Sequence, residues 1–350
     1  MNASSPALVP ARAAAAPLWG PSAGAPRGRR YVIVSPCRDE AAFMRRTLES
    51  VSRQTVPPAL WVVVDDGSTD ETPAILAEYE KRLPYLRVVR RTDRGGRSVG
   101  PGVIVAFYEG LARVDLSSFE YLCKLDMDLD LPERYFETLL ARMEAEPRLA
   151  TCSGKAYFAE AGTGRLISEG VSDEVSIGAS KFYRVRAFAQ IGGFVREVMW
   201  DGIDCHRCRL RGWIAQSWDE PALNFLHLRP MGSSDRGILR GRVRHGFGQY
   251  FMGTSAAYMF ASAVYRLPHP PVVIGALAHL WGFFISAAKR VRRYEEPGFR
   301  PFLRRYQWAC LIKGKKRATA EINERQRSVW KPDEPGLGVD QQFTSVPAAV

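Results

Sequence analysis

Short apolar runs alternate with amphipathic stretches along the first part of the chain. The stretch 40–54 carries Met44, Leu48 and Val51 at positions i, i+4 and i+7, which is the core-facing stripe of a helix. The runs with the length and composition of buried strands are 31–35, 60–64, 86–89 and 121–125. Strands that alternate with helices of about 10 to 15 residues predict an α/β fold with a mostly parallel sheet.

Beyond residue 130 the pattern predicts further helices and an antiparallel edge. Helices are expected over 134–143, over 182–190 and over 200–211, the second of them closed by Gly192 and Gly193. The Gly-rich, weakly alternating segment 149–178 is typical of antiparallel strands joined by hairpins. We therefore expect the parallel sheet to continue into antiparallel strands.

Carboxylates follow two of the predicted strands. Asp65 and Asp66 end the second strand and lead into Gly67. Asp126 and Asp128 follow the fourth strand, and their spacing of two places them on one face of an extended chain. The carboxyl ends of parallel strands open into the crevice where α/β proteins bind ligands. Carboxylates in this crevice can hold a divalent ion that in turn binds a diphosphate, which points to sugar-nucleotide chemistry.

An ordered set of motifs resembles the family 2 glycosyltransferases, which have the GT-A fold. The set covers about residues 31–230, and its order makes it far more specific than any single motif. Its members are Val32-Ile33-Val34-Ser35-Pro36-Cys37-Arg38-Asp39-Glu40, Asp65-Asp66-Gly67-Ser68-Thr69-Asp70, Asp126-x-Asp128, Gly192-Gly193-Phe194 and Trp200-Asp201. The resemblance implies a mostly parallel α/β sheet flanked by helices, and an inverting hexosyl or glycosyl transfer from a nucleotide-sugar, with UDP the expected nucleotide.

The resemblance also assigns roles to individual side chains. A divalent metal, Mg2+ or Mn2+, would be held by Asp128 as the direct ligand, with Asp126 and His227. An Asp beside Gly67 is also a common turn residue, and His227 can equally be an ordinary polar residue of a strand. The residues implied to contact the donor nucleotide-sugar are Pro36, Arg38, Glu40, Asp66 and Asp126.

Asp201 stands where the family carries its general base. It lies near the start of a predicted helix that ends at Gly212, and a carboxylate there can take the proton of an acceptor hydroxyl. Asp204, one turn further on, is the alternative base, and Asp201 can also cap the helix. The chain departs from the family pattern at Trp200, where relatives carry Glu, and at Arg38, where many carry Asn.

The last third of the chain is basic and contains two apolar segments. The protein has 49 Lys and Arg against 37 Asp and Glu, a net charge of +12, and the excess follows residue 229. The segments 250–265 and 272–288 are mostly apolar, and basic clusters flank the pair at 236–244 and 289–293. Positive charge at both ends favours an interfacial or re-entrant helical hairpin on an anionic membrane surface, at the cytoplasmic face. The alternative is a pair of core helices in a cytoplasmic protein.

Other classes of protein fit the composition less well. No nucleic-acid-binding module accompanies the basic charge, so nucleic acid is not an expected partner. The six cysteines form no disulfide-like framework, which indicates reduced thiols. Residues 1–30 are rich in Ala, Pro, Gly and Ser and contain no apolar run long enough for a signal peptide.

We expect four segments: a disordered arm over 1–30, a GT-A catalytic domain over 31–232, a basic, apolar helical region over 233–330 that associates with a membrane, and a flexible tail over 331–350. The expected function is transfer of a sugar to a glycan or polyprenyl-linked acceptor in polysaccharide biosynthesis, of the bacterial cell-surface or exopolysaccharide type. Two alternatives stay open. One is a non-catalytic, membrane-associated protein that binds nucleotide-sugars. The other is a nucleotidyltransferase, although Ser35-Pro36-Cys37-Arg38 is not the Gly-rich basic loop of that class.

Overall fold

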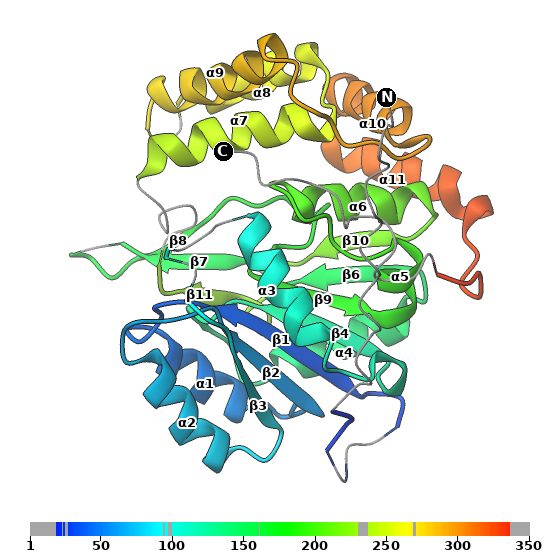
Figure 1. Ribbon diagram of the computed structural model, residues 1–350. Coiled ribbons are helices and arrows are strands. Elements are labelled where there is room, and N and C mark those ends of the chain that lie inside the picture. Colours follow the sequence, from blue (N-terminus) through cyan, green and yellow to red (C-terminus); the bar gives the residue numbers. More distant parts are fainter. Residues whose placement is uncertain are drawn as a thin grey trace, which may run out of the picture.

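Two sheets and a layer of carboxyl-terminal helices make up the fold (Figure 1). The computed structural model describes residues 19–22, 24, 27–93, 95–96, 100–160, 162–229, 237–268 and 271–336. Most of the predicted arm and of the predicted tail therefore lies outside the described residues. Trp19 is an exception, because its backbone bonds to Arg113 and Asp115 and pairs with Val114. This part of the arm is ordered, contrary to the expectation for 1–30.

The central sheet has seven strands in the order β10-β6-β9-β4-β1-β2-β3. Parallel pairs join β1 to β2, β1 to β4, β2 to β3 and β6 to β10, whereas β9 runs antiparallel to both β4 and β6. The mostly parallel α/β sheet is thus confirmed. Its strands are β1 (Tyr31–Cys37), β2 (Leu60–Asp65), β3 (Leu86–Arg90), β4 (Tyr121–Leu125), β6 (Leu149–Ser153), β9 (Ser180–Arg184) and β10 (Ile214–Ser217).

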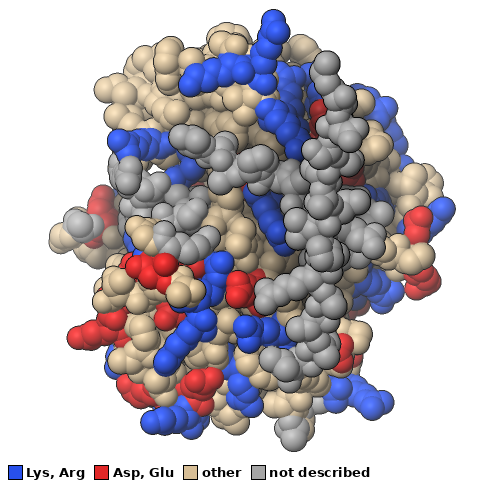
Figure 2. Space-filling view, viewed as in Figure 1, with Lys and Arg blue, Asp and Glu red and all other residues tan. Residues whose placement is uncertain are grey.

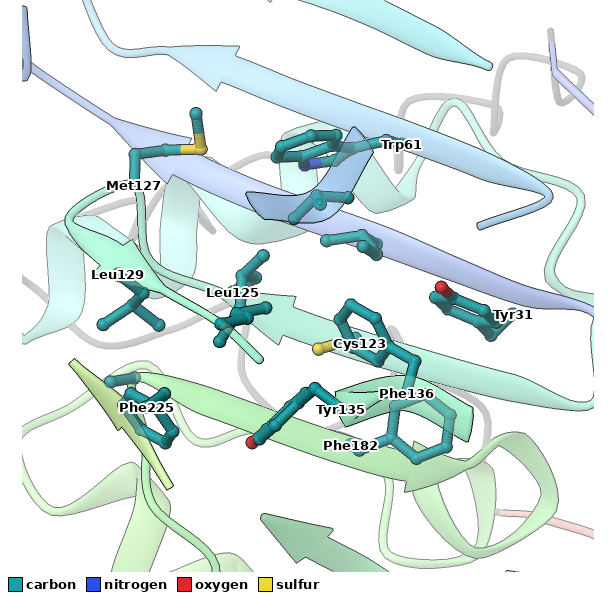
Figure 3. Packing of buried hydrophobic residues seen from close by; sticks show 14 of the residues in the cluster. Tyr31, Trp61, Cys123, Leu125, Met127, Leu129, Tyr135, Phe136, Phe182 and Phe225 are labelled. Atoms are coloured by element: carbon teal, nitrogen blue, oxygen red, sulfur yellow. The ribbon is translucent and has the colours of Figure 1, made fainter. Parts of the chain in front are cut away.

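Side chains of the strands alternate between two cores, one on each face of the sheet. Tyr31 and Ile33 point to the face covered by α1, α2 and α4, where Phe136 and Phe182 also pack (Figure 3). Val32 and its neighbours on alternate positions point to the face covered by α3, α5 and α6. These helices are α1 (Met44–Ser52), α2 (Thr72–Arg82), α3 (Pro101–Leu111), α4 (Tyr135–Ala145), α5 (Val185–Gln190) and α6 (Trp200–Leu210). Burial on both faces explains why the strands are continuously apolar.

The prediction of a helix over 182–190 is wrong for its first residues. Residues Ser180–Arg184 form β9, and α5 begins only at Val185. The reason is tertiary, because β9 fits between β4 and β6 and its backbone pairs with both neighbours. Such pairing on two sides outweighs a helical pattern in a segment this short.

A smaller sheet lies beside the end of β4, in the order β5-β11-β7-β8. Its strands are β5 (Leu129–Asp130), β7 (Ala156–Ala159), β8 (Leu166–Ser168) and β11 (Phe225–His227). The hairpin of β7 and β8 agrees with the antiparallel pattern predicted for 149–178. Because β11 pairs with β5, His227 lies opposite Leu129, two residues after Met127.

Five helices follow the sheets: α7 (Ile238–Met252), α8 (Ala256–Arg266), α9 (Ile274–Ala288), α10 (Phe299–Lys313) and α11 (Lys315–Arg325). The apolar segment 250–265 is divided at Gly253, whose φ of 92° ends α7, so the hairpin consists of α8 and α9. Figure 1 shows α7 between this pair and the sheets. No helix in the described residues has the length and apolar character needed to cross a membrane.

Candidate active site

The loops after β1 and β2 bring two of the predicted donor-binding residues together. Arg38 is buried and donates one hydrogen bond to the carbonyl of Asp66 at 2.8 Å and another to the carboxylate of Asp93 at 2.7 Å. The carboxylate of Asp66 accepts a hydrogen bond from Arg91 at 2.5 Å. Pro36 lies opposite Val64 in the parallel register of β1 and β2. This rim of the crevice is therefore braced by pairs of opposite charge.

Asp128 and Glu40, far apart in the sequence, share one guanidinium. The Nη2 atom of Arg229 donates to Asp128 Oδ2 at 2.8 Å and to Glu40 Oε1 at 2.7 Å. Both carboxylates are buried, and a charge-assisted hydrogen bond of this kind offsets part of the cost of burying them. The structure thus joins the loop after β1 to the Asp126-x-Asp128 segment.

His227 lies between two carboxylates. Its Nε2 atom is 3.6 Å from Asp128 Oδ1, and its Nδ1 atom is 3.0 Å from Glu169 Oε1. Burial disfavours the imidazolium, but hydrogen bonds to Asp128 and Glu169 outweigh it and raise the pKa of His227 to about 10. Burial likewise opposes the charge of Asp128, yet His227 and Arg229 prevail and lower the pKa of Asp128.

The Asp128–His227 pair fits one side of a divalent-metal site. An oxygen and a nitrogen 3.6 Å apart can be spanned by metal–ligand bonds of about 2.1 Å. Glu169 holds the second ring nitrogen, as carboxylates commonly do for metal-binding histidines. Within the described ranges, His, Cys, Asp and Glu do not gather in a group of three or more that could hold a metal ion. Metal sites on nucleotides often need only one or two protein carboxylates, because phosphates supply further ligands.

The carboxylate of Asp126 connects the strand end to the neighbouring strand β9. It pairs with Lys124 Nζ, which also donates to the carbonyl of Gly178 at 2.9 Å. Gly178 lies beside Asp201, because a Cβ atom at Gly178 would be 2.9 Å from Asp201 Oδ2. Asp126 and Asp201 therefore border the same part of the site.

The two candidate bases have different surroundings. Asp204 is fully buried, and its oxygens accept hydrogen bonds from Lys181 Nζ at 2.7 Å and from the hydroxyl of Tyr183. Burial raises the pKa of Asp204. Asp201 lies in the first turn of α6 and is partly exposed, with its side chain next to Gly178. Asp204 is thus engaged inside the protein, and Asp201 faces the site.

Trp200, which replaces the family's Glu, lies over two lysines. Lys124 and Lys181 are cross-strand partners in β4 and β9, and their Nζ atoms are 5.4 and 5.6 Å from the centre of the Trp200 ring. Met199, directly before α6, has the left-handed φ of 67°, a costly conformation for a residue with a side chain. The aromatic ring thus occupies space above two buried cations, where it is attracted to both.

The sequence interpretation missed three residues of this site: Lys124, Glu169 and Arg229. A signal existed for Lys124, because it lies in an otherwise apolar or aromatic strand where only a paired cation can be buried. Nothing in the local sequence distinguishes Glu169 or Arg229. Their partners are 58 and 189 residues away in the chain.

A mostly parallel α/β sheet with carboxylates at its carboxyl edge and a small second sheet beside them defines the GT-A class of nucleotide-sugar transferase folds. Residues 32–200 match the model of the family described as glycosyl transferase family 2. This match and the fold confirm the resemblance drawn from the motifs.

The individual relatives have low sequence identity to this chain. EpsH of Bacillus subtilis (strain 168) is 24% identical over 267 residues, which are 76% of this chain and 63% of that protein. The poly-beta-1,6-N-acetyl-D-glucosamine synthase of Staphylococcus epidermidis is 25% identical over 118 residues, 34% of this chain and 26% of the synthase. The solved structure of GalNAc-T7 with UDP, GalNAc and Mn2+ is 13% identical, with a TM-score of 0.50 over 81% of this chain and 57% of that one. The chain thus spans less than two thirds of each.

Proposed function

We propose that this chain is an inverting, metal-dependent glycosyltransferase that moves a sugar from a nucleotide-sugar, with UDP the expected nucleotide, to a hydroxyl of its acceptor. One observation carries the proposal. Asp66, Asp126 and Asp128 follow the carboxyl ends of β2 and β4. Asp201, in the first turn of α6, lies beside Gly178, whose carbonyl accepts a hydrogen bond from Lys124, the partner of Asp126. The carboxyl edge of a parallel sheet is the usual ligand site of an α/β fold.

The donor would lie along the ends of β1, β2 and β4. We place Asp66 where it can accept hydrogen bonds from the base or ribose of the nucleotide, and Arg91 donates a hydrogen bond to its carboxylate. Arg38 secures the neighbouring loop through Asp93 and the carbonyl of Asp66. Pro36, Glu40 and Asp126 complete this wall. A braced wall of this kind orients the donor without moving during the reaction.

Asp128 and His227 would hold the metal, with Asp126 on the side of the ribose. The bound ion supplies positive charge that neutralises the leaving nucleoside diphosphate. Glu169 keeps the imidazole of His227 in one orientation, and Arg229 holds the second oxygen of Asp128. These two residues would therefore act by positioning the proposed ligands.

Asp201 would act as the general base. Its carboxylate takes the proton of the acceptor hydroxyl as that oxygen attacks the anomeric carbon, and the bond to the diphosphate breaks on the opposite face. Asp204 fits this role less well, because both its oxygens already accept hydrogen bonds from Lys181 and Tyr183 inside the fold. Single displacement by one base inverts the configuration at the anomeric carbon.

For the acceptor we propose a glycan or polyprenyl-linked sugar of a polysaccharide pathway. The S. epidermidis relative is named as a polysaccharide synthase, and its similarity covers 34% of this chain. A nearby basic helix supports an anionic acceptor, because α7 carries Arg242 and Arg244, and His245 of the same helix interacts electrostatically with both and with Asp201. A phosphate-linked acceptor complements such a helix.

The test compares two carboxylates on one short segment. Asp128→Asn should reduce Mn2+-dependent release of UDP from a UDP-sugar to background, because it removes a charged proposed ligand at constant volume. Asp130→Asn is the matched control, since Asp130 bonds to Arg46 at 2.8 Å, away from His227 and Arg229. Equal activity of both variants across a Mn2+ titration contradicts the metal assignment.

The same assay separates the two alternative functions. A non-catalytic binding protein would bind the UDP-sugar, measured by calorimetry, and release no UDP with any acceptor extract. A nucleotidyltransferase would release pyrophosphate from a nucleoside triphosphate and a sugar phosphate. Either outcome replaces the proposed reaction.

A further inference from the structure

Helix α9 buries mostly small side chains and exposes most of its large apolar ones. Its buried positions are occupied by Gly275, Ala276, His279, Gly282, Phe283 and Ser286. Its exposed stripe has the spacing i, i+3, i+7, i+10, with Ile274 at 58% exposure, Leu277 at 57%, Trp281 at 63% and Phe284 at 38%. A helix of a water-soluble core has the reverse arrangement. This face is therefore built to meet an apolar environment.

Helix α8 extends the same surface. It buries only Met259 and Ala263, and it exposes Phe260, Val264 and, just after its end, Leu267. The rings of Phe260 and Phe284 lie 5.3 Å apart, so the two exposed stripes meet. We call the set the α8–α9 apolar surface: Phe260, Val264, Leu267, Ile274, Leu277, Trp281 and Phe284. A continuous apolar patch of this kind marks an interaction site on a soluble domain.

The charges around this surface have a single sign. Between Asp235 and Glu295 the chain contains no acidic residue and nine Lys or Arg. Of these, Arg240, Lys289, Arg290 and Arg292 are exposed, at the start of α7 and just after the end of α9. Figure 2 shows the corresponding face over α8 and α9 as mostly uncharged, with Lys and Arg beside it. An apolar surface bordered only by cations complements an anionic lipid headgroup layer.

We propose that the α8–α9 apolar surface docks onto an anionic membrane, with both helices lying in the plane of the interface. The exposed side chains form one stripe on each helix, whereas a spanning helix would need an apolar circumference and greater length. Trp281 and the nearby exposed Tyr265 are of the type that occupies the headgroup boundary. A second copy of the chain is the other occupant that an apolar face allows, but two copies would oppose cations to cations.

The position of α7 connects this surface to the candidate site. On one side α7 meets α9 closely, because a Cβ atom at Gly246 would lie 2.0 Å from the carbonyl oxygen of His279. On its other side, Gly248 of α7 approaches Val198 and Met199, just before α6 and Asp201. A docked membrane would therefore be separated from Asp201 by two packed helices, α9 and α7. The docking itself is independent of the proposed reaction, and it favours an acceptor presented at the lipid surface.

The test measures sedimentation of the purified full chain with vesicles of phosphatidylcholine alone or with 30% phosphatidylglycerol. We expect binding to the anionic vesicles, and a loss of at least tenfold in the partition coefficient for the double variant Leu277→Glu/Trp281→Glu. The matched control is Leu166→Glu, which adds a charge at an apolar residue of β8 that is 59% exposed. It should bind as the unmodified protein does. Raising NaCl should weaken binding only in part, since apolar contact is not screened.

Two outcomes overturn the proposal. One is a protein that stays in the supernatant with both vesicle types, or a double variant that binds as well as Leu166→Glu. The other is a dimer in analytical ultracentrifugation that the double variant dissociates while vesicle binding is absent, because the surface would then be occupied by a second copy. Thermal unfolding and UDP release without vesicles should be unchanged in the double variant, so failure of docking and failure of the proposed reaction give different results.

Discussion

The central sheet and the α7–α9 region differ in the size of the side chains that they bury. In the sheet, large side chains such as Tyr31, Trp61 and Phe182 fill the interior. In α9 four of the six buried positions are Gly, Ala or Ser, and Trp281 is exposed. The contrast agrees with the proposed docking of the α8–α9 apolar surface on lipid, because small residues permit close helix approach where solvent does not drive apolar packing.

The pKa values of two buried histidines, His227 and His279, also differ between these regions. His227, in the sheet half, lies between Asp128 and Glu169, and its pKa is raised to about 10. His279, in α9, is buried, and neither ring nitrogen has a hydrogen-bond partner within the described part of the chain. Burial, together with Arg266, His245 and Arg242, lowers the pKa of His279 to about 3. Near His227, carboxylates stabilise the buried positive charge. Around His279 no such partner is present within the described residues, and burial disfavours the charged form.

We expect the largest effects from replacing the two neighbouring carboxylates Asp201 and Asp204, one on catalysis and the other on stability. Asp201→Asn should lower kcat by about 10²- to 10⁴-fold with little change in melting temperature, because it removes a positioned base at an exposed site. Asp204→Asn should instead cost about 3–5 kcal/mol of unfolding free energy, because Lys181 is left buried without its partner. Steady-state kinetics and chemical denaturation measure both. A stable but inactive Asp204→Asn variant would transfer the role of base to Asp204.

A smaller effect tests the close packing of α7 on α9. Alanine normally favours a helix over glycine by about 1 kcal/mol, so Gly282→Ala would stabilise an open helix. Here the new Cβ atom would lie 2.0 Å from the carbonyl oxygen of Val243 in α7, and we expect a net destabilisation of about 1–3 kcal/mol. Gly96→Ala is the control, because a Cβ atom there meets nothing within 4 Å. A higher melting temperature for Gly282→Ala would show that the helices are not closely packed.

A further effect, spread over several pH units, is the pH dependence caused by His279. The unfolded chain takes up this proton near the usual pKa of 6.5, whereas the folded state takes it up only at about 3. Stability from His279 is therefore constant above pH 6.5 and decreases as the pH falls towards 3, by up to about 1.4 kcal/mol per pH unit. His279→Leu should flatten the stability profile between pH 6 and 4 relative to the unmodified protein. Identical profiles, measured by urea unfolding at each pH, would contradict a neutral, buried His279.

Local pattern was enough to predict much of the fold and part of the site. The run Tyr121–Leu125 is β4 with the predicted bounds, and Met44, Leu48 and Val51 form the buried stripe of α1. These features depend on spacing within a few residues, which the sequence states directly. The carboxylates at the ends of β2 and β4 were predictable for the same reason, since a parallel sheet brings strand ends to one edge.

Contacts between distant segments were decided only by the tertiary structure. Glu169 meets His227, Arg229 meets Glu40, and Ser180–Arg184 becomes a strand because two neighbours pair with it. Which apolar stripe of α9 faces inward was also undetermined, because hydrophobic periodicity marks an apolar face without saying whether protein or lipid covers it. By itself the sequence determined most of the elements, the resemblance to the family and the carboxylates at the strand ends. Packing determined the partners of each charge and the outward face of α9, because both depend on groups that are near in space and far apart in the chain.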